Sequence, residues 1–328
     1  MSGLELGLVA ALPPALVLPH LLPLQRVHPA TAASGWLCTL SLRALVAIGA
    51  AIFTFVYMPR TGVYDAVAHW CWHEALPVVA THLGLSGHPL VHAAIVLPGL
   101  AMAGSVLWAL FGLARAWLML RTRLRGAVGE GPLGSTVIAD DQIVVGVTGL
   151  GRSRIVVSDV ALGSMDADEL QASLSHELGH IRRRHRPLLL AASVLGATGR
   201  LLPGTRAAES ELRFSLERDA DEYAVGRTRD PLSLASAICK AATAKSLAGT
   251  AGLGGGGRVS LRLDYLEGQS ERAGRGLERG VRLLAVTLAM AVCALSATLP
   301  SWALATPRAE HAVKVTGAHC ATDPAPSR

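Results

Sequence analysis

This sequence contains two histidines four residues apart, with a glutamate directly after the first. The types and spacing of these residues are its clearest indication of metal-dependent chemistry. The stretch "LSHELGHIRRRH" runs from Leu174 to His185 and contains His176, Glu177 and His180. On a helix, positions four apart lie on one face, so the first two histidines can bind one metal ion together. Zinc suits this pair because it takes neutral imidazole and carboxylate ligands and leaves one position for water. Glu177 is then placed to act as the general base.

A zinc site of this type needs a third ligand from elsewhere in the chain. His185 is the nearest candidate, but it lies five residues beyond His180. Metzincins place their third histidine six beyond, with a glycine midway, and this chain has an arginine there. In "LERDADEYA", Glu217 and Asp221 lie one turn apart on a predicted helix. We predict that Glu217 completes a His-His-Glu set and that Asp221 accepts a hydrogen bond from a ligand imidazole. The alternative is a solvated acidic helix face.

The first two histidines must be positioned by a helix, and the sequence from Met165 onward predicts one. Asp166 stands at the cap position with Glu169 three residues on, the arrangement of a capping box. We expect the helix to end at Arg186-Pro187, because the residue before a proline disfavours helical geometry. Apolar side chains at helical spacing predict its buried stripe: Leu170, Leu174, Leu178 and Ile181.

The segments that follow this helix are also predicted to be mainly helical. The apolar run Pro187–Leu202 is too short to span a membrane and is predicted to be buried or re-entrant. A second helix over about Ala207–Arg227 carries Glu217, and a further helical stretch extends to about Leu247. Gly249–Arg258 is glycine-rich and is predicted to be a flexible linker.

A small antiparallel sheet is predicted before the first helix. Asp-Asp and Gly-Leu-Gly turns separate three runs rich in β-branched residues, which are Thr136–Ala139, Ile143–Thr148 and Arg154–Val157. The glycine-rich residues Gly126–Gly134 in front of them are predicted to be a linker.

The composition indicates a membrane protein. The chain has 328 residues, of which 51% are hydrophobic and only 16% are charged, whereas soluble domains average about 25% charged residues. Four apolar runs are long enough for a hydrocarbon core that takes about 20 residues to cross: Leu4–Leu24, Trp36–Met58, Leu90–Leu120 and Val281–Ala305. The first run lacks the basic residues of a secretory signal, so we predict a retained span.

The basic residues predict the orientation of these spans. Most of the 30 Lys and Arg residues lie between Arg115 and Arg282, whereas the loop Pro59–Pro89 has only Arg60. The positive-inside rule therefore places the large segment in the cytoplasm and both termini outside. The same rule accounts for the basic charge, so nucleic acid binding is not expected.

Two cysteines, Cys71 and Cys320, are predicted to lie on the outer side, where disulfides persist. They either pair or remain free thiols. Cys38 and Cys293 fall within predicted spans, and Cys239 falls in the cytoplasmic segment.

The motifs of the central segment resemble a known group of enzymes. HELGH, the later Glu-x-x-Ala-Asp, and "RIVVSDVALGSMDADEL" are similar to gluzincin membrane metallopeptidases, first the BlaR/MecR type and then the HtpX and CAAX prenyl protease group. The resemblance covers about Thr136 to Leu247. It implies that His176 and His180 are zinc ligands.

In those families the matching carboxylates also have assigned roles. The resemblance implies that Glu177 is catalytic, that Glu217 is the third ligand and that Asp221 supports a ligand. An edge strand pairs with the substrate backbone in this class, and Ile143–Thr148 or Arg154–Ser158 is a candidate for it. Tyr223 and His185 are candidates for stabilising the oxyanion.

These observations predict a membrane α-helical protein with four transmembrane helices and a cytoplasmic α+β gluzincin-type metallopeptidase insertion. The expected divisions are 1–125 for three spans, 126–248 for the zinc metallopeptidase domain, 249–280 for a linker and amphipathic segment, 281–305 for the fourth span and 306–328 for an extracytoplasmic tail. The antibiotic-sensing relatives carry a penicillin-binding domain after the last span, whereas about 23 residues follow Ala305 here, so sensing of that type is not expected.

The expected function is zinc-dependent hydrolysis of peptide bonds in a protein or peptide substrate, at the cytoplasmic face of the lipid bilayer. A role in regulatory proteolysis is one reading, and membrane quality control or prenyl-type processing is another. A third reading, of a different class, is a signalling or scaffold membrane protein with a vestigial zinc site.

Overall fold

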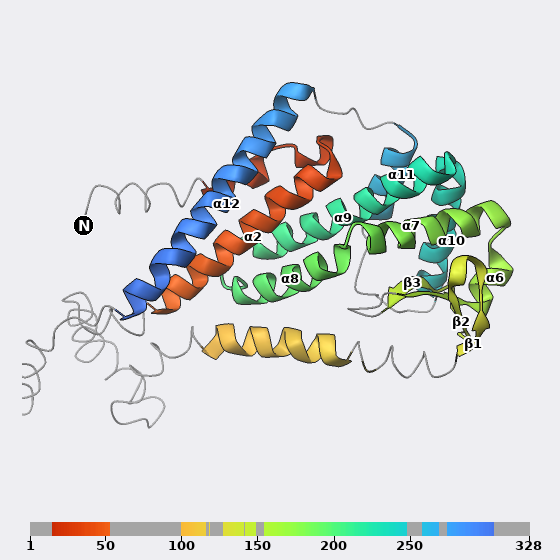
Figure 1. The fold of residues 1–328 in the computed structure, drawn as a ribbon, viewed down its shortest axis with the longest axis horizontal. Coiled ribbons are helices and arrows are strands. Elements are labelled where there is room, and N and C mark those ends of the chain that lie inside the picture. The colour runs from red at the N-terminus through yellow and green to blue at the C-terminus, as the bar shows by residue number, and fades with distance from the viewer. Residues whose placement is uncertain are drawn as a thin grey trace, which may run out of the picture.

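The computed structural model describes residues 15–52, 100–115, 118, 127–140, 142–148, 154–247, 258–268 and 274–304. These residues are mostly helical, with one four-stranded sheet. Figure 1 shows two long helices, α2 (Pro29–Ile52) and α12 (Arg275–Leu304), side by side at one end and the sheet at the other. A group of further helices connects the two ends and contains the histidine motif.

The sheet has the order β1-β2-β4-β3. Its strands are β1 (Ala127–Glu130), β2 (Thr136–Ile138), β3 (Val145–Thr148) and β4 (Arg154–Ser158). The two outer pairs are antiparallel, but β2 and β4 run parallel, so the prediction of a purely antiparallel sheet is wrong at its centre. Three consecutive apolar residues in β4 explain this order, because a central strand is buried on both faces. They are Ile155, Val156 and Val157, all at most 6% exposed.

The strand β1 lies where the sequence predicted a linker. Its four residues, Ala127–Glu130, are all exposed, and they pair with β2. A strand without a buried face has no alternation of apolar and polar residues, so the usual sequence signal is absent. The prediction that residues Gly126–Gly134 form a linker is therefore wrong over the strand.

The helix that carries the histidine motif, α7 (Ala167–Arg182), begins with the predicted capping box. The Asp166 side chain accepts the backbone N–H of Glu169 at 2.8 Å, and the Glu169 carboxylate accepts the backbone N–H of Asp166 at 2.9 Å. The predicted apolar stripe is confirmed, because Leu174 lies in a core with Ile155 and Val157 of β4 and the other three stripe residues pack against it.

The end of α7 differs from the prediction. The helix stops at Arg182, and Arg184 adopts a left-handed conformation with φ of 55° before α8 (His185–Thr198) begins. Pro187 therefore lies in the first turn of α8, where a missing N–H costs no helical hydrogen bond. The proline marks the start of a new helix and not the end of the old one.

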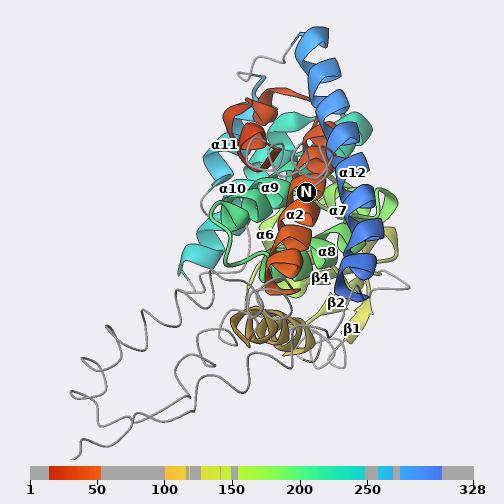
Figure 2. The same cartoon turned by 90° about the vertical axis from the view of Figure 1, so that its left-hand side faces the viewer.

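The second predicted helix is α9 (Thr205–Thr228), followed by α10 (Pro231–Leu247) and α11 (Val259–Leu266). Figures 1 and 2 both show α2 between α12 and α9. Large apolar side chains from these three helices form one core: Trp36, Leu40, Leu212, Leu216 and Val281. The long apolar helices thus pack directly against a helix of the site.

Two helices of the described residues are long and apolar enough to cross a membrane, Pro29–Ile52 and Gly276–Ala297. They overlap the second and fourth predicted spans, Trp36–Met58 and Val281–Ala305. The third predicted span is described in part, as a shorter apolar helix over Leu100–Arg115. Much of the first span lies outside the described residues, so the total of four spans stays a prediction. The possible pairing of Cys71 with Cys320 also lies outside them.

Candidate metal centre

The site lies where α7 and α9 cross, and Gly179 allows the two helices to approach closely. A Cβ atom at this position would lie 3.2 Å from side-chain atoms of Tyr223 and 3.3 Å from the backbone of Ala220. The glycine of the HELGH motif is therefore explained by packing. Because Gly179 has no side chain, the histidine face of α7 can lie directly against the acidic face of α9.

This crossing brings together three potential metal ligands, His176, His180 and Glu217. The Nε2 atoms of the two histidines lie 3.2 Å apart. Carboxylate oxygens of Glu217 lie 3.5 Å from Nε2 of His176 and 3.6 Å from Nε2 of His180. Tetrahedral zinc with bonds of about 2.0–2.2 Å places neighbouring ligand atoms about 3.3–3.6 Å apart. The observed triangle fits such an ion.

Asp221 lies on the other side of the His176 ring. Its Oδ1 is 2.8 Å from Nδ1 of His176, a close ionic contact that is poorly aligned for a hydrogen bond. A carboxylate at this nitrogen favours a proton there and leaves the Nε2 lone pair for a metal ion. The structure thus places Asp221 where the predicted supporting residue belongs.

Arg262 of α11 is a residue of the site that the sequence did not indicate. It donates from Nε and from a terminal nitrogen to the two Asp221 oxygens, at 2.8 and 2.7 Å. Its other terminal nitrogen lies 3.2 Å from Glu217. Asp221 is fully buried, so its charge needs such a partner. The arginine comes 41 residues after the aspartate, and no local spacing relates the two.

The charges of this site favour a cation between the histidines and Glu217. Burial opposes the charged form of His176, but the contacts with Asp221 and Glu217 outweigh it and raise the pKa to about 10. The pKa of His180 is lowered to about 3 by burial and by the charge of His176. Burial raises the pKa of Glu217, but both histidines lower it further, well below its usual range. The two carboxylates thus stabilise one positive charge in this group, and that charge disfavours a second one on His180.

Glu177 lies beside the same group of charges. Burial raises its pKa to about 7, although His176 and Arg262 act in the opposite direction. A general base works best with a pKa near the operating pH. The carboxylate predicted to be catalytic therefore has an environment suited to exchanging a proton.

His185 is not part of the ligand group. Its Nδ1 lies 3.0 Å from Nδ1 of His180, the nitrogen that faces away from the donor triangle. Its Nε2 lies 2.9 Å from Asp219. The alternative that His185 is the third ligand is thus not favoured, and both of its ring nitrogens are already engaged. This argues against a role for it at the oxyanion as well.

Tyr223, the other candidate for the oxyanion, packs between helices. Its side chain fills the space over Gly179, and the guanidinium of Arg183 lies 5.8 Å from the ring centroid. These contacts give Tyr223 a packing role at the helix crossing, and its proposed catalytic role stays a prediction.

One of the two candidate substrate strands lies at an edge of the sheet. β3 pairs only with β4 among the described strands, whereas β4 is interior. Arg186, in the first turn of α8, donates a hydrogen bond to the backbone oxygen of Val147 in β3. This contact fixes β3 against the helix corner that follows the histidine motif.

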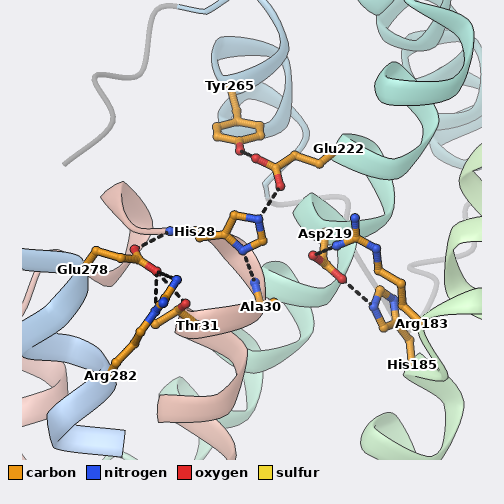
Figure 3. A network of polar contacts seen from close by, with 10 residues as sticks. All are labelled: His28, Ala30, Thr31, Arg183, His185, Asp219, Glu222, Tyr265, Glu278 and Arg282. Carbon is orange, nitrogen blue, oxygen red and sulfur yellow. Dashed lines mark hydrogen bonds and ion pairs between the residues drawn. The ribbon is translucent and has the colours of Figure 1, made fainter. Parts of the chain in front are cut away.

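A second group of potential ligands, His28, Asp219 and Glu222, lies nearby (Figure 3). Its geometry is better explained by a hydrogen-bond network. The backbone N–H of Ala30 donates to Nδ1 of His28 at 3.3 Å, so a neutral ring carries its proton on Nε2. That nitrogen lies 3.2 Å from Glu222 and donates to it. The His28 ring therefore offers no lone pair to a metal ion.

Comparison with known proteins agrees with the geometry of the site. Residues 137–241 match peptidase family M48. A search of curated proteins and a search of solved structures found no match. The matched range includes most of β2, all of β3, β4, α7, α8 and α9, and part of α10. It therefore contains His176, His180 and Glu217. The match does not specify the BlaR/MecR type. Residues 137–241 are thus similar to peptidase family M48, and this similarity supports a metallopeptidase function.

Proposed function

We propose that the protein is a membrane-integrated, zinc-dependent endopeptidase that cleaves protein or peptide substrates at the cytoplasmic face. The observation that carries this proposal is the donor triangle of His176, His180 and Glu217, whose 3.2–3.6 Å edges suit tetrahedral zinc. It lies within the residues that match a peptidase family. Imidazole and carboxylate donors are the ligands that zinc prefers in hydrolytic sites.

The residues around the triangle have separate roles in this proposal. Zinc, when bound, polarises the scissile carbonyl and makes water acidic enough to attack at neutral pH. The Glu177 carboxylate accepts the proton of the attacking water and later donates it to the leaving amine. Asp221 and Arg262 hold the His176 ring and Glu217 in place. The outer edge of β3, which no other described strand covers, pairs with an extended substrate backbone.

The two long apolar helices support the membrane location. A core helix of a soluble protein is mostly buried, but only 17% of the apolar window of α12 and 39% of that of α2 are buried. Large apolar side chains are exposed on α12 and on the helix over Leu100–Arg115. They are Leu283, Val286, Met290, Leu107, Trp108 and Phe111. Lipid would cover surfaces of this kind.

Glu177→Gln tests the mechanism. The substitution leaves the three donor groups intact, so we expect zinc content and thermal stability near those of the wild type. Loss of the general base should reduce cleavage of a casein substrate in detergent by roughly 10²–10⁴-fold. Asp168→Asn on an exposed position of the same helix is the matched control and should retain activity.

Each result separates two readings of the site. Near wild-type cleavage by Glu177→Gln would refute the assigned base. A wild-type protein that binds zinc weakly and cleaves nothing would favour a scaffold with a vestigial site. Comparing membrane proteomes of cells with the wild type and with Glu177→Gln would then distinguish a single regulatory substrate from the broad set expected for quality control.

A further inference from the structure

His180 and Asp219 are connected through a buried histidine. Nδ1 of His185 lies 3.0 Å from Nδ1 of His180, and its Nε2 lies 2.9 Å from Oδ2 of Asp219. The His185 side chain is only 2% exposed and that of Asp219 only 4%. Arg183 contacts the other oxygen of Asp219 (Figure 3). His180, His185 and Asp219 thus form a continuous chain of contacts, which begins at a potential zinc ligand and ends at the ion pair of Asp219 with Arg183.

The direction of each hydrogen bond in this chain follows from its acceptor end. The Asp219 carboxylate, paired with Arg183, only accepts, so Nε2 of His185 donates to it. With the single N–H of a neutral ring on Nε2, Nδ1 of His185 is an acceptor. The nitrogen facing it, Nδ1 of His180, must therefore be the donor. This leaves the lone pair of His180 on Nε2, the atom that faces His176 and Glu217.

We propose that His185 and Asp219 are positioning residues that fix the tautomer and ring orientation of His180 for zinc binding. The inference rests on the proposed zinc peptidase function and assigns a role to two residues beyond the ligand set. A second imidazole, and not a carboxylate, contacts the ligand directly.

The other histidine has a related support, in which the carboxylate contacts the ring directly. Nδ1 of His176 faces Asp221, and Arg262 holds that carboxylate. Nδ1 of His180 faces His185, and the carboxylate behind it is held by Arg183. Both carboxylates come from α9, the helix that also carries Glu217. Each ligand histidine thus has its own oriented support, and both supports end in an arginine–carboxylate pair.

Substitution of His185 tests the proposal through zinc affinity. His185→Phe keeps a ring of similar size but has no hydrogen-bonding atoms, so we expect zinc affinity to fall about 10–100-fold. His185→Gln carries one acceptor and one donor, which can accept from His180 and donate to Asp219, and should restore affinity to within a few-fold of the wild type. Affinity is measured by competition with a chelator, using the full chain in detergent.

Two further measurements separate positioning from a general effect on folding. The absorption spectrum of the cobalt-substituted protein reports ligand geometry and should change in His185→Phe but not in His185→Gln. Asp219→Asn removes the charged acceptor with little change of shape, and it should lower zinc affinity less than His185→Phe does. If His185→Phe does not fold, unchanged affinity in Asp219→Asn overturns the proposal.

The outcomes also distinguish this inference from the proposed function. A wild-type protein that binds zinc and cleaves peptide, with His185→Phe binding zinc equally well, would overturn only the positioning role. Equal losses in the phenylalanine and glutamine variants would overturn it too, because rescue would have failed. A wild-type protein that does not bind zinc would refute the peptidase function itself.

Discussion

A buried ion pair holds the acidic side of the site together. Asp221 is fully buried and Arg262 is 13% exposed at its side chain, and the arginine also reaches Glu217. The charges on Asp221 and Glu217 lie close together on one helix, so the arginine offsets repulsion between them. The pKa of Asp221 is raised by burial, but Arg262 and His176 lower it more, and the carboxylate stays ionised.

Arg262→Met should therefore destabilise the protein strongly. Removing one partner of a buried pair leaves an uncompensated charge and costs about 3–5 kcal/mol. Arg262→Lys keeps a charge but loses the two-pronged contact, so its loss should be smaller. Chemical denaturation with a zinc chelator present measures both. If the methionine variant is as stable as the wild type, Arg262 does not compensate Asp221.

Some residues of the site could be predicted from the sequence and others could not, for a physical reason. His176, His180, Glu217 and Asp221 stand out because helical periodicity fixes which side chains share a face. Arg262 and the contact between His185 and Asp219 depend on how separate helices pack. They join residues 41 and 34 positions apart, and no short pattern encodes such pairs. Glu217 is placed with the histidines as predicted, but its role as a ligand stays a prediction.

The first turn of α7 determines how firmly the histidine helix starts. Asp166 caps the helix and Glu169 completes the box. We expect Asp166→Ala to lower the free energy of unfolding by about 0.5–2 kcal/mol. Asp166→Ser, which keeps a capping oxygen, should restore most of the loss. Urea denaturation measures both, and equal stability of the alanine and wild-type proteins would contradict the role of the cap.

Glu169 also makes this element sensitive to acid. The hydrogen bonds from Lys240 and then Ser236 lower its pKa to about 2, with Lys240 2.6 Å away. A carboxylate with a depressed folded-state pKa stabilises the protein above its unfolded value of about 4.3, and this stabilisation is lost as the pH falls towards 2.

Glu169→Gln should remove this part of the pH dependence. We expect the variant to be less stable than the wild type at pH 7 and to approach it in stability near pH 2. Asp168→Asn, an exposed neighbour, is the matched control. The measurement is urea denaturation across this range, and a stability difference that does not shrink on acidification would contradict the assignment.

Predictions at this scale succeed where an element has one buried face. The stripe of α7 is confirmed because it packs on β3 and β4. β1 was not predicted because its residues are exposed on both faces. The parallel pairing of β2 with β4 was not predicted because the residue pattern of a strand does not show in which direction its neighbour runs. The end of α7 was misplaced because a proline is equally compatible with the first turn of α8.

At the scale of the whole molecule, the long apolar helices α2 and α12 share one core with α9. Trp36 and Leu40 of α2 lie with Leu212 and Leu216 of α9, the helix that carries Glu217. The buried Arg43 of α2 extends this contact, because it donates to the backbone oxygen of Pro203 just before α9. The hydrophobic runs alone predict long helices but not this docking. The position of α2 is thus fixed directly against α9.

The orientation of the molecule can be tested through its own cysteines. Cys239 is exposed on α10, in the segment that the distribution of basic residues places in the cytoplasm. A membrane-impermeant maleimide should therefore leave Cys239 unlabelled in intact cells and label it after permeabilisation. Cys71 and Cys320 are predicted to lie outside and should be labelled in intact cells, either directly or only after reduction if they form a disulfide.

Peptide mapping by mass spectrometry identifies which thiol reacted, and Cys239→Ser is the control for the assignment of its peptide. Labelling of Cys239 also reports on the location of the site, because α7, α9 and most of α10 lie within the same matched range and contact each other. Under the proposed function, the side of the bilayer that exposes Cys239 would be the side on which the proposed metal centre meets its substrates. Labelling of Cys239 in intact cells would place the metallopeptidase domain outside and reverse the proposed orientation, while leaving the geometry of the centre and its proposed chemistry unchanged.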